Sequence, residues 1–132
     1  MEMTAAIVLA ADDPATLAWF YAGLLDVQPQ PGLSASHWRV AWPAGGFLEL
    51  YAPSRRRPQP RQQGRIAVCL QRPVRGQAAM EALQGWIERA CTDGASLWEP
   101  PREESFGIEA WLLDPEGNGL LLMVLQDSAA PS

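Results

Sequence analysis

The sequence is poor in the residues that build disulfide frameworks and metal sites. It has two cysteines, Cys69 and Cys91, with no CxxC pair, and a single histidine, His37. Two isolated cysteines do not form the cross-links of a disulfide-stabilised scaffold. The first residues, MEMTAAIVLAADD, lack a basic leader, and their apolar run is too short to span a bilayer. We therefore expect a soluble, cytoplasmic protein that has no membrane partner.

Positive charge is scarce as well. The formal net charge is −5, which argues against nucleic acid as a partner. Hydrophobic residues make up 48% of the 132 residues, enough for a packed core in one domain. The one basic segment, SRRRPQPRQQGR from Ser54 to Arg65, contains no apolar residue and is interpreted as a solvated linker.

The expected secondary structure repeats once along the chain. Asp13 and Pro14 are typical of the start of a helix, and apolar residues then recur at helical spacing until about Asp26. The PAGG sequence indicates a hairpin loop, and VQPQPGL indicates at most a short edge strand. The pattern predicts strands at 5–11, 36–42 and 47–51 around the first helix, then a strand at 65–71, a helix at 76–94, a short strand at 95–99 and a final hairpin across the DPEGNG turn.

This order predicts an α+β fold built from two strand–helix–three-strand modules. We expect one domain over 1–132, with module 1 at about 1–53, a linker at 54–63, module 2 at about 64–126 and a tail at 127–132. One helix covers only one face of each sheet, so the other face is left open for a ligand or a partner.

Alternation along the strands predicts which residues lie on each face. One set is consistently aliphatic and is assigned to the helix-covered face: Ile7, Leu9, Leu48, Leu50, Ile66, Val68, Leu70, Leu120, Leu122 and Val124. The opposite set is more mixed and is assigned to the open face: Ala6, Val8, Ala10, Phe47, Glu49, Tyr51, Arg65, Ala67, Cys69, Leu121, Met123 and Leu125. Followed through the PAGG hairpin, the alternation predicts Trp38, Val40 and Trp42 on the open face and His37 on the other.

The six tryptophans exceed the needs of an ordinary core of this size. Trp38 and Trp42 are candidates to stack on a flat ligand, with packing against a second subunit as the rival interpretation. The helical Trp19 and Trp86 are expected in the core or at an interface. The faces of Trp98 and Trp111 stay open at this point, because a PPREES loop is expected between their strands.

Three segments resemble the vicinal oxygen chelate superfamily, which includes glyoxalase I, bleomycin resistance proteins and extradiol dioxygenases. They are DDPATLAWFYAGLLDV, GGFLELY and DPEGNGLLLMV, and the resemblance covers nearly the whole chain. It implies a pair of βαβββ modules that curl their sheets around a cleft, with the helices on the outer face, and it implies a homodimer. In the metal-dependent members of that superfamily, four inward residues hold a divalent ion.

The resemblance places those four positions at Ala6, Glu49, Arg65 and Leu121. Only Glu49 carries a donor for a cation, because alanine and leucine have no donor atoms and arginine is permanently charged. We therefore expect neither a metal nor another cofactor. Glu49 and Arg65 are expected to pair across the cleft, either as a structural ion pair or as a polar handle for a ligand.

Two functions follow as hypotheses. The first is a metal-independent protein that binds a flat aromatic or cationic small molecule, such as an antibiotic. The second is a glyoxalase-like lyase or isomerase, or a dioxygenase-type enzyme, without metal and with Glu49 as the general base. A module whose open face is only a subunit interface is a third reading. The predicted ligand contacts are Trp38, Trp42, Phe47, Glu49, Tyr51, Arg65, Trp111 and Leu121.

Overall fold

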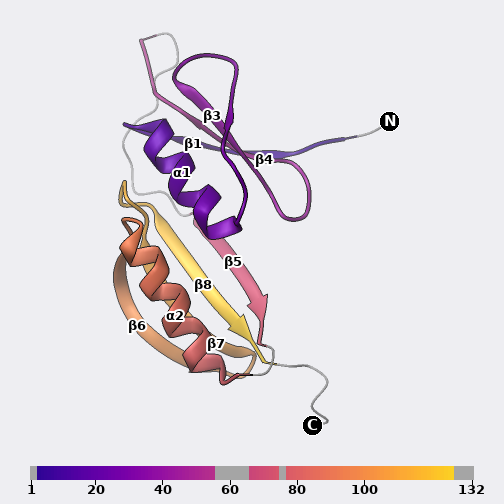
Figure 1. Ribbon diagram of the computed structural model, residues 1–132, viewed down its shortest axis with the longest axis vertical. Helices are drawn as coiled ribbons and strands as arrows, with labels where there is room; N and C mark the ends of the chain where they lie inside the picture. Colours follow the sequence, from indigo (N-terminus) through magenta and orange to yellow (C-terminus); the bar gives the residue numbers. More distant parts are fainter. Residues whose placement is uncertain (1–2, 56–65, 75–76, 127–132) are drawn as a thin grey trace. The chain divides into compact units, whose positions relative to one another are not determined.

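The computed structural model describes residues 3–55, 66–74 and 77–126, and the chain divides into two compact units, 1–62 and 63–132. We call them module 1 and module 2, and each is considered by itself (Figure 1). Module 1 contains β1 (Ala6–Ala10), α1 (Pro14–Leu25), β2 (Gln30–Pro31), β3 (His37–Ala41) and β4 (Phe47–Tyr51). Module 2 contains β5 (Val68–Pro73), α2 (Ala79–Thr92), β6 (Ser96–Glu104), β7 (Gly107–Leu113) and β8 (Gly119–Leu125). The predicted α+β fold of two βαβββ modules is confirmed.

Each module folds around one mixed sheet of four strands. The strand order is β1-β4-β3-β2 in module 1 and β5-β8-β7-β6 in module 2. The first strand of each module lies parallel to the last, and the remaining pairs are antiparallel. The two modules therefore share one topology although their sequences differ.

The helix ends follow the expected signals. The Asp13 side chain accepts a hydrogen bond from the Thr16 backbone N–H (3.2 Å), and Pro14 is the first helical residue of α1. α1 ends before Asp26, which adopts the left-handed conformation. α2 ends before Asp93, and Gly94 follows with a φ of +118° that favours glycine.

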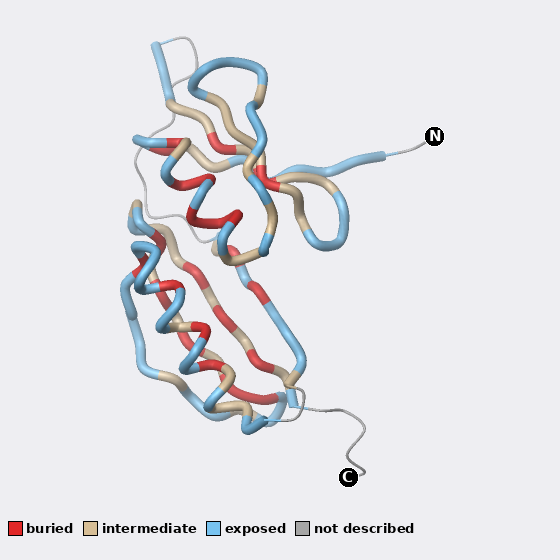
Figure 2. The backbone as a smooth tube through the Cα atoms, viewed as in Figure 1, coloured by how far each residue is buried: buried red, intermediate tan, exposed pale blue. Residues whose placement is uncertain are grey.

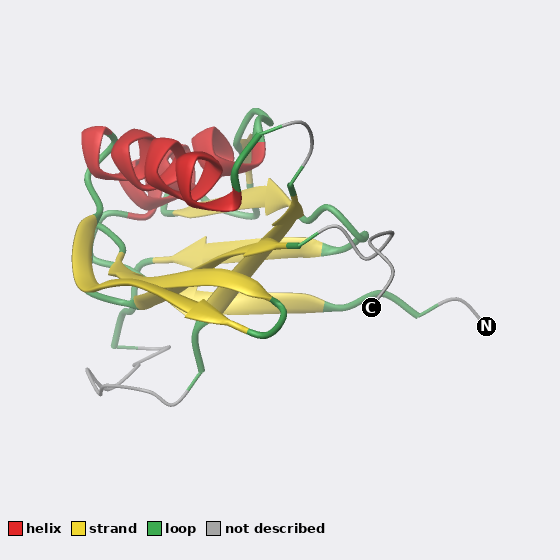
Figure 3. Ribbon diagram, turned by 90° about the horizontal axis from the view of Figure 1, so that it is seen from below, coloured by secondary structure: helices red, strands yellow, loops and turns green. Residues whose placement is uncertain are grey.

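Each helix covers one face of its own sheet. α1 contacts β3 and β4, and α2 contacts β6, β7 and β8 (Figure 3). Along β4, β7 and β8 the residues alternate between buried and half-buried, as β8 shows most plainly (Figure 2). The fully covered strand residues of the two cores include Val40, Leu48, Leu50, Leu112, Leu120, Leu122 and Val124. The predicted helix-covered face is confirmed for β4 and β8.

Two details of module 2 differ from the prediction. β5 begins at Val68, so Ile66 precedes the strand and is 85% exposed instead of covered by the helix. β6 runs through the two prolines as far as Glu104, so PPREES is not a loop. Proline lacks the backbone N–H of a ladder, but β6 is an edge strand with two register shifts, where that loss is tolerated.

Among the helices of the described residues, none is long and apolar enough to cross a membrane.

Candidate functional site

The β3–β4 hairpin brings different side chains to the open face of module 1 than the sequence predicted. Glu49 lies opposite Arg39, and Leu50 lies opposite Trp38. Directly paired residues of antiparallel strands share a face. Arg39 and His37 therefore lie on the face of Glu49, while Trp38 lies on the face of the buried Leu50. The predicted places of Trp38, Val40 and His37 are wrong.

The error arises in the loop of the hairpin. A four-residue PAGG loop would pair Trp42 with Phe47, but the Trp42 N–H donates to the Gly46 carbonyl (3.0 Å). The loop therefore spans 42–46, and Ala41 pairs with Phe47. This shift by one residue moves every side chain of β3 to the other face. Trp42 lies beyond β3, in this loop, and is half-buried, so its place on the open face stays a prediction.

A cluster of three polar side chains occupies the open face of module 1. Arg39 Nε donates to both oxygens of Glu49, at 2.7 Å to Oε1 and 3.1 Å to Oε2. His37 Nε2 lies 3.1 Å from the same Oε1. The side chains of Glu49 and His37 are only 16% and 15% exposed. A carboxylate held in this way has its charge balanced within its own sheet.

The hydrogen bonds of His37 fix its tautomer. The Leu33 backbone N–H donates to His37 Nδ1 (2.8 Å), so Nδ1 is an acceptor and the ring proton lies on Nε2. Nε2–H is then the donor to Glu49. The ring lies against Gly32, at a place that a Cβ atom on this residue would occupy. A glycine at position 32 is the one sequence feature that reflects this contact. It could be interpreted only after the register of β3 was known.

Phe47 and Val8 flank the cluster. The Arg39 guanidinium lies 4.0 Å from the centre of the Phe47 ring, in a cation–π arrangement. Val8 lies beside Glu49 in the parallel register and is exposed. Tyr51, the partner of His37 across the hairpin, is half-buried. The arrangement leaves a small apolar border around a charge-balanced centre.

The open face of module 2 carries a group of aromatic and apolar side chains. Trp111 pairs with Leu121, and both alternate with buried residues, so both lie on the face away from α2. The centre of the Trp98 ring lies 6.0 Å from that of Trp111, at an angle of 76° between the planes. Cys69 shares this face, as the alternation predicted, with its sulfur 3.4 Å from that of Met123, and it is exposed.

An ion cluster lies on the same face, because Glu109 alternates along β7 in phase with Trp111 and pairs with Met123. The Arg102 side chain bonds Glu109 (Nη2 to Oε1, 3.1 Å) and Glu104 (Nε to Oε1, 2.9 Å). The hydrogen bond to Glu109, together with the charges of both carboxylates, raises the pKa of Arg102. Glu103 and Glu104 belong to the PPREES segment that was expected to form a loop, whereas both lie within β6.

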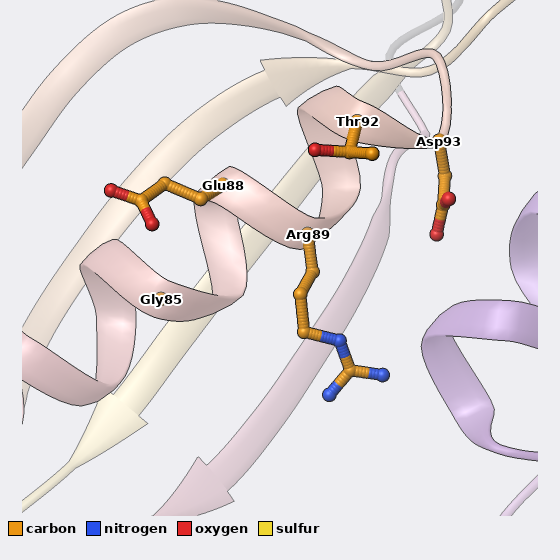
Figure 4. Close-up of a pocket in the computed structure, with 5 residues that line it drawn as sticks. All are labelled: Gly85, Glu88, Arg89, Thr92 and Asp93. Atoms are coloured by element: carbon orange, nitrogen blue, oxygen red, sulfur yellow. The ribbon is translucent and has the colours of Figure 1, made fainter.

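A hollow of about 370 Å³ lies along α2 (Figure 4). It is lined by Gly85, Glu88, Arg89, Thr92 and Asp93, all of them exposed. This part of α2 is turned away from its sheet, and the lining mixes both signs of charge without a large hydrophobic side chain. No predicted site residue lies there, so the hollow is not a candidate site.

The described residues do not fit a divalent metal at the family positions. Ala6 and Leu121 offer no donor atom, and both oxygens of Glu49 already accept hydrogen bonds from Arg39. Arg65 lies outside the described residues. Its predicted pairing with Glu49 therefore also falls outside them. Within 3–55, 66–74 and 77–126, no three His, Cys, Asp or Glu side chains gather as metal ligands would.

Two βαβββ modules in tandem define the fold class of the vicinal oxygen chelate superfamily, and the comparisons agree. The family model of the glyoxalase-like domain matches residues 6–123. The chain therefore belongs to the glyoxalase-like domain family.

Solved structures share the fold at low sequence identity. A glyoxalase-related enzyme from Fulvimarina pelagi superposes with a TM-score of 0.72 at 17% identity, covering 94% of this chain and 88% of the other. A glyoxalase/bleomycin resistance protein from Albidiferax ferrireducens gives 0.66 at 20% identity, with 93% and 98% covered. A glyoxalase/bleomycin resistance protein/dioxygenase family enzyme from Burkholderia phytofirmans gives 0.72 at 16% identity, with 91% and 96% covered. At these identities the likeness concerns the fold alone. No curated protein matches the sequence.

Proposed function

We propose that the protein binds a flat, aromatic small molecule without the help of a metal ion. The observation that carries this proposal is the state of Glu49. At a position where metal-dependent relatives hold a ligand to the ion, this carboxylate is bound by Arg39 and faces His37. A metal would have to displace a permanent cation that already balances the charge.

Arg39 takes the role that the sequence suggested for Arg65. Its guanidinium supplies positive charge beside Glu49 and lies over the Phe47 ring in a cation–π contact. The pair is half-buried, which limits the screening of its attraction by solvent. A charge-balanced centre of this kind supports binding more than chemistry that depends on a Lewis acid.

Each module presents an open face with features that suit a flat ligand. Module 1 offers Phe47 and Tyr51 around the cluster of Glu49, and module 2 offers Trp111 next to Leu121. Aromatic rings and aliphatic side chains give large apolar contact areas with a few polar groups for orientation. Contacts by these residues, the homodimer and a cytoplasmic location remain predictions from the sequence.

The enzyme alternative has less support. A general base must accept a proton from the substrate, but both oxygens of Glu49 already accept hydrogen bonds from Arg39. His37 Nε2–H is a further donor to Oε1, so it competes with a substrate for that oxygen. A lyase, isomerase or dioxygenase-type activity through Glu49 would need these contacts to open first.

The test combines metal analysis with ligand titration. Untagged protein is dialysed against zinc, nickel, manganese and iron(II), its metal content is measured, and planar aromatic compounds are then titrated by calorimetry. We expect metal well below one ion per chain, and saturable binding of at least one compound that Trp111→Leu weakens. Trp19→Leu serves as the control, because Trp19 lies on the exposed side of α1. Stoichiometric metal, or no binding by any compound, would refute the proposal.

A further inference from the structure

The first of two register shifts in β6, between Leu97 and Glu99, gives Trp98 an unusual position. Leu97 pairs with Leu112 and Glu99 pairs with Trp111, so Trp98 is an extra residue without a partner on β7. Such a bulge redirects the side chain of the inserted residue. Pro100 and Pro101 lie in the second shift, between Glu99 and Arg102. The regular pairing of β6 with β7 is interrupted there, so the absence of a backbone N–H in proline is tolerated.

The bulge directs Trp98 toward Trp111. The two indoles stand nearly perpendicular, with ring centres 6.0 Å apart, and form a corner at the edge of the open face of module 2. Trp98 remains 55% exposed in spite of this contact. An indole face carries negative electrostatic potential, so this corner attracts positive charge.

Glu99 adds a full negative charge at the same place. It lies directly opposite Trp111, and directly paired residues of antiparallel strands have neighbouring side chains. Within the part of the chain that the structure describes, Glu99 has no hydrogen bond or ion pair, whereas Glu104 and Glu109 share Arg102. One uncompensated carboxylate therefore lies next to the indole corner.

Two arginines of the described residues cover other aromatic rings. Arg39 lies over Phe47 at 4.0 Å and Arg72 lies over Trp86 at 4.8 Å. Among the described residues, no arginine lies over Trp98 or Trp111. Two aromatic rings of the protein thus contact arginines of the same chain. The indole corner and its adjacent carboxylate remain accessible to a cation from solution.

We propose that Trp98, Trp111 and Glu99 bind the positively charged group of an organic cation, such as a ring nitrogen that carries a methyl group or a quaternary ammonium. Leu121, the neighbour of Trp111 on β8, contacts the apolar body of the same ligand. This inference rests on the proposed function and narrows its ligand class from flat aromatic compounds to flat aromatic cations.

The test compares two probes of the same shape. N-methylquinolinium carries a positive charge, and 1-methylnaphthalene is its neutral counterpart. Calorimetry with the full chain should show roughly tenfold tighter binding of the cation, as expected for a cation–π contact supported by a carboxylate. Glu99→Gln and Trp98→Leu should each weaken binding of the cation several-fold, and Glu99→Gln should leave the neutral probe unchanged.

Matched controls separate this site from general effects. Trp19 is also 55% exposed, and Glu88 is an exposed carboxylate on α2, so Trp19→Leu and Glu88→Gln remove an equivalent indole and an equivalent charge elsewhere. Neither should change the affinity for N-methylquinolinium. Circular dichroism of each variant confirms that it is folded.

The outcomes distinguish this inference from the proposed function. Equal affinity for both probes would overturn the cation site while flat aromatic binding stands. Loss of binding with Trp19→Leu or Glu88→Gln, and none with Trp98→Leu or Glu99→Gln, would overturn it too. If neither probe binds but another neutral aromatic compound does, the cation site fails alone. If no aromatic compound binds, both fail.

Discussion

The two modules are alike where their helices lie and unlike on the opposite face. Beneath α1 and α2, both sheets present buried aliphatic residues on the strand that pairs in parallel with the first strand. On the open face, module 1 carries Glu49 with its own cation. Module 2 carries two indoles, the Arg102–Glu109 pair, and Glu99, which has no partner among the described residues. The helix-covered face must exclude water for the fold to exist, so its chemistry is constrained. The open face is free to differ, and the difference between the modules lies there.

The largest effect should come from the shared core. Leu48→Ala in module 1 and Leu122→Ala in module 2 each remove a fully buried side chain, and each should lower the free energy of unfolding by about 2–5 kcal/mol. Urea denaturation measures both losses. Leu33→Ala, at an exposed position, should stay within about 0.5 kcal/mol of the wild type. A loss below about 1 kcal/mol for only one of the two core variants would show that the cores are not equivalent.

The second largest effect on stability should come from the turns before the last strands, which differ between the two modules. The module 2 turn depends on Asp114, a buried carboxylate whose Oδ1 accepts from the backbone N–H groups of Glu116 and Asn118, both at 2.9 Å. Asp114→Ala leaves these donors unpaired and should cost about 2–3 kcal/mol in urea denaturation. Asp114→Asn keeps one acceptor and should cost less. Equal losses for both variants would contradict a role for the retained oxygen.

The module 1 turn depends instead on glycine conformation. Gly45 has a φ of +100° with open space around it, whereas Gly46 has a φ of +78° and a Cβ there would meet the carbonyl oxygen of Ala5. Gly45→Ala should cost about 1 kcal/mol through backbone strain alone. Gly46→Ala adds a steric clash and should cost clearly more. Thermal unfolding of the two variants compares them, and the reverse order would refute this account of the turn.

The open faces should then respond differently to the same chemical change. Glu49→Gln removes the charge that Arg39 pairs with, and should lower the free energy of unfolding by about 1 kcal/mol, reduced from a buried pair by partial exposure. Glu99→Gln removes an exposed charge without a partner in the described chain and should change stability by less than about 0.5 kcal/mol. Equal effects in urea denaturation would erase the contrast between the two faces.

The smallest effect concerns the helix starts, because Asp13 caps α1 while Ala78 provides no side-chain cap for α2. The hydrogen bond from the Thr16 hydroxyl, followed by that from its backbone N–H, lowers the pKa of Asp13 below its ordinary 3.8. A folded-state pKa below the unfolded one stabilises the protein above pH 3.8, and this contribution disappears as the pH falls through the lowered pKa. Asp13→Ala should therefore lower the thermal midpoint at pH 6 slightly, and the difference from the wild type should vanish in strong acid.

Ala78→Asp is the converse experiment in module 2. A carboxylate at the uncapped start of α2 should raise the free energy of unfolding by about 0.5–1 kcal/mol at neutral pH. A loss of stability in this variant would show that the backbone around Ala78 does not admit a side-chain cap.

The sequence predicted the order of elements because each one has its own local signal. Asp13 with Pro14 marked the start of α1, and the aliphatic alternation of β8 marked its buried face. These signals depend on helix capping, backbone conformation and burial, which act within a few residues. The two βαβββ modules could therefore be predicted without a structure.

The site could not be predicted to the same depth, because it depends on register. Moving the loop closure from Trp42–Phe47 to Trp42–Gly46 exchanged Trp38 for Arg39 on the face of Glu49. The Trp98–Trp111 corner likewise depends on a bulge that no local pattern announced. A hairpin register is decided by the packing of whole strands, and a single residue of error reverses every face assignment.

The parallel pairing of first and last strands also bears on how quickly each module forms. The hairpins β3–β4 and β7–β8 close over short turns. The paired strands β1 and β4, and likewise β5 and β8, are separated in sequence by the other elements of their module. Closing these long loops lowers the conformational entropy of the chain before the strand pairing contributes stability. We expect the first strand of each module to dock late, so that mutations in β1 and β5 accelerate unfolding more than they slow folding, as stopped-flow kinetics would register.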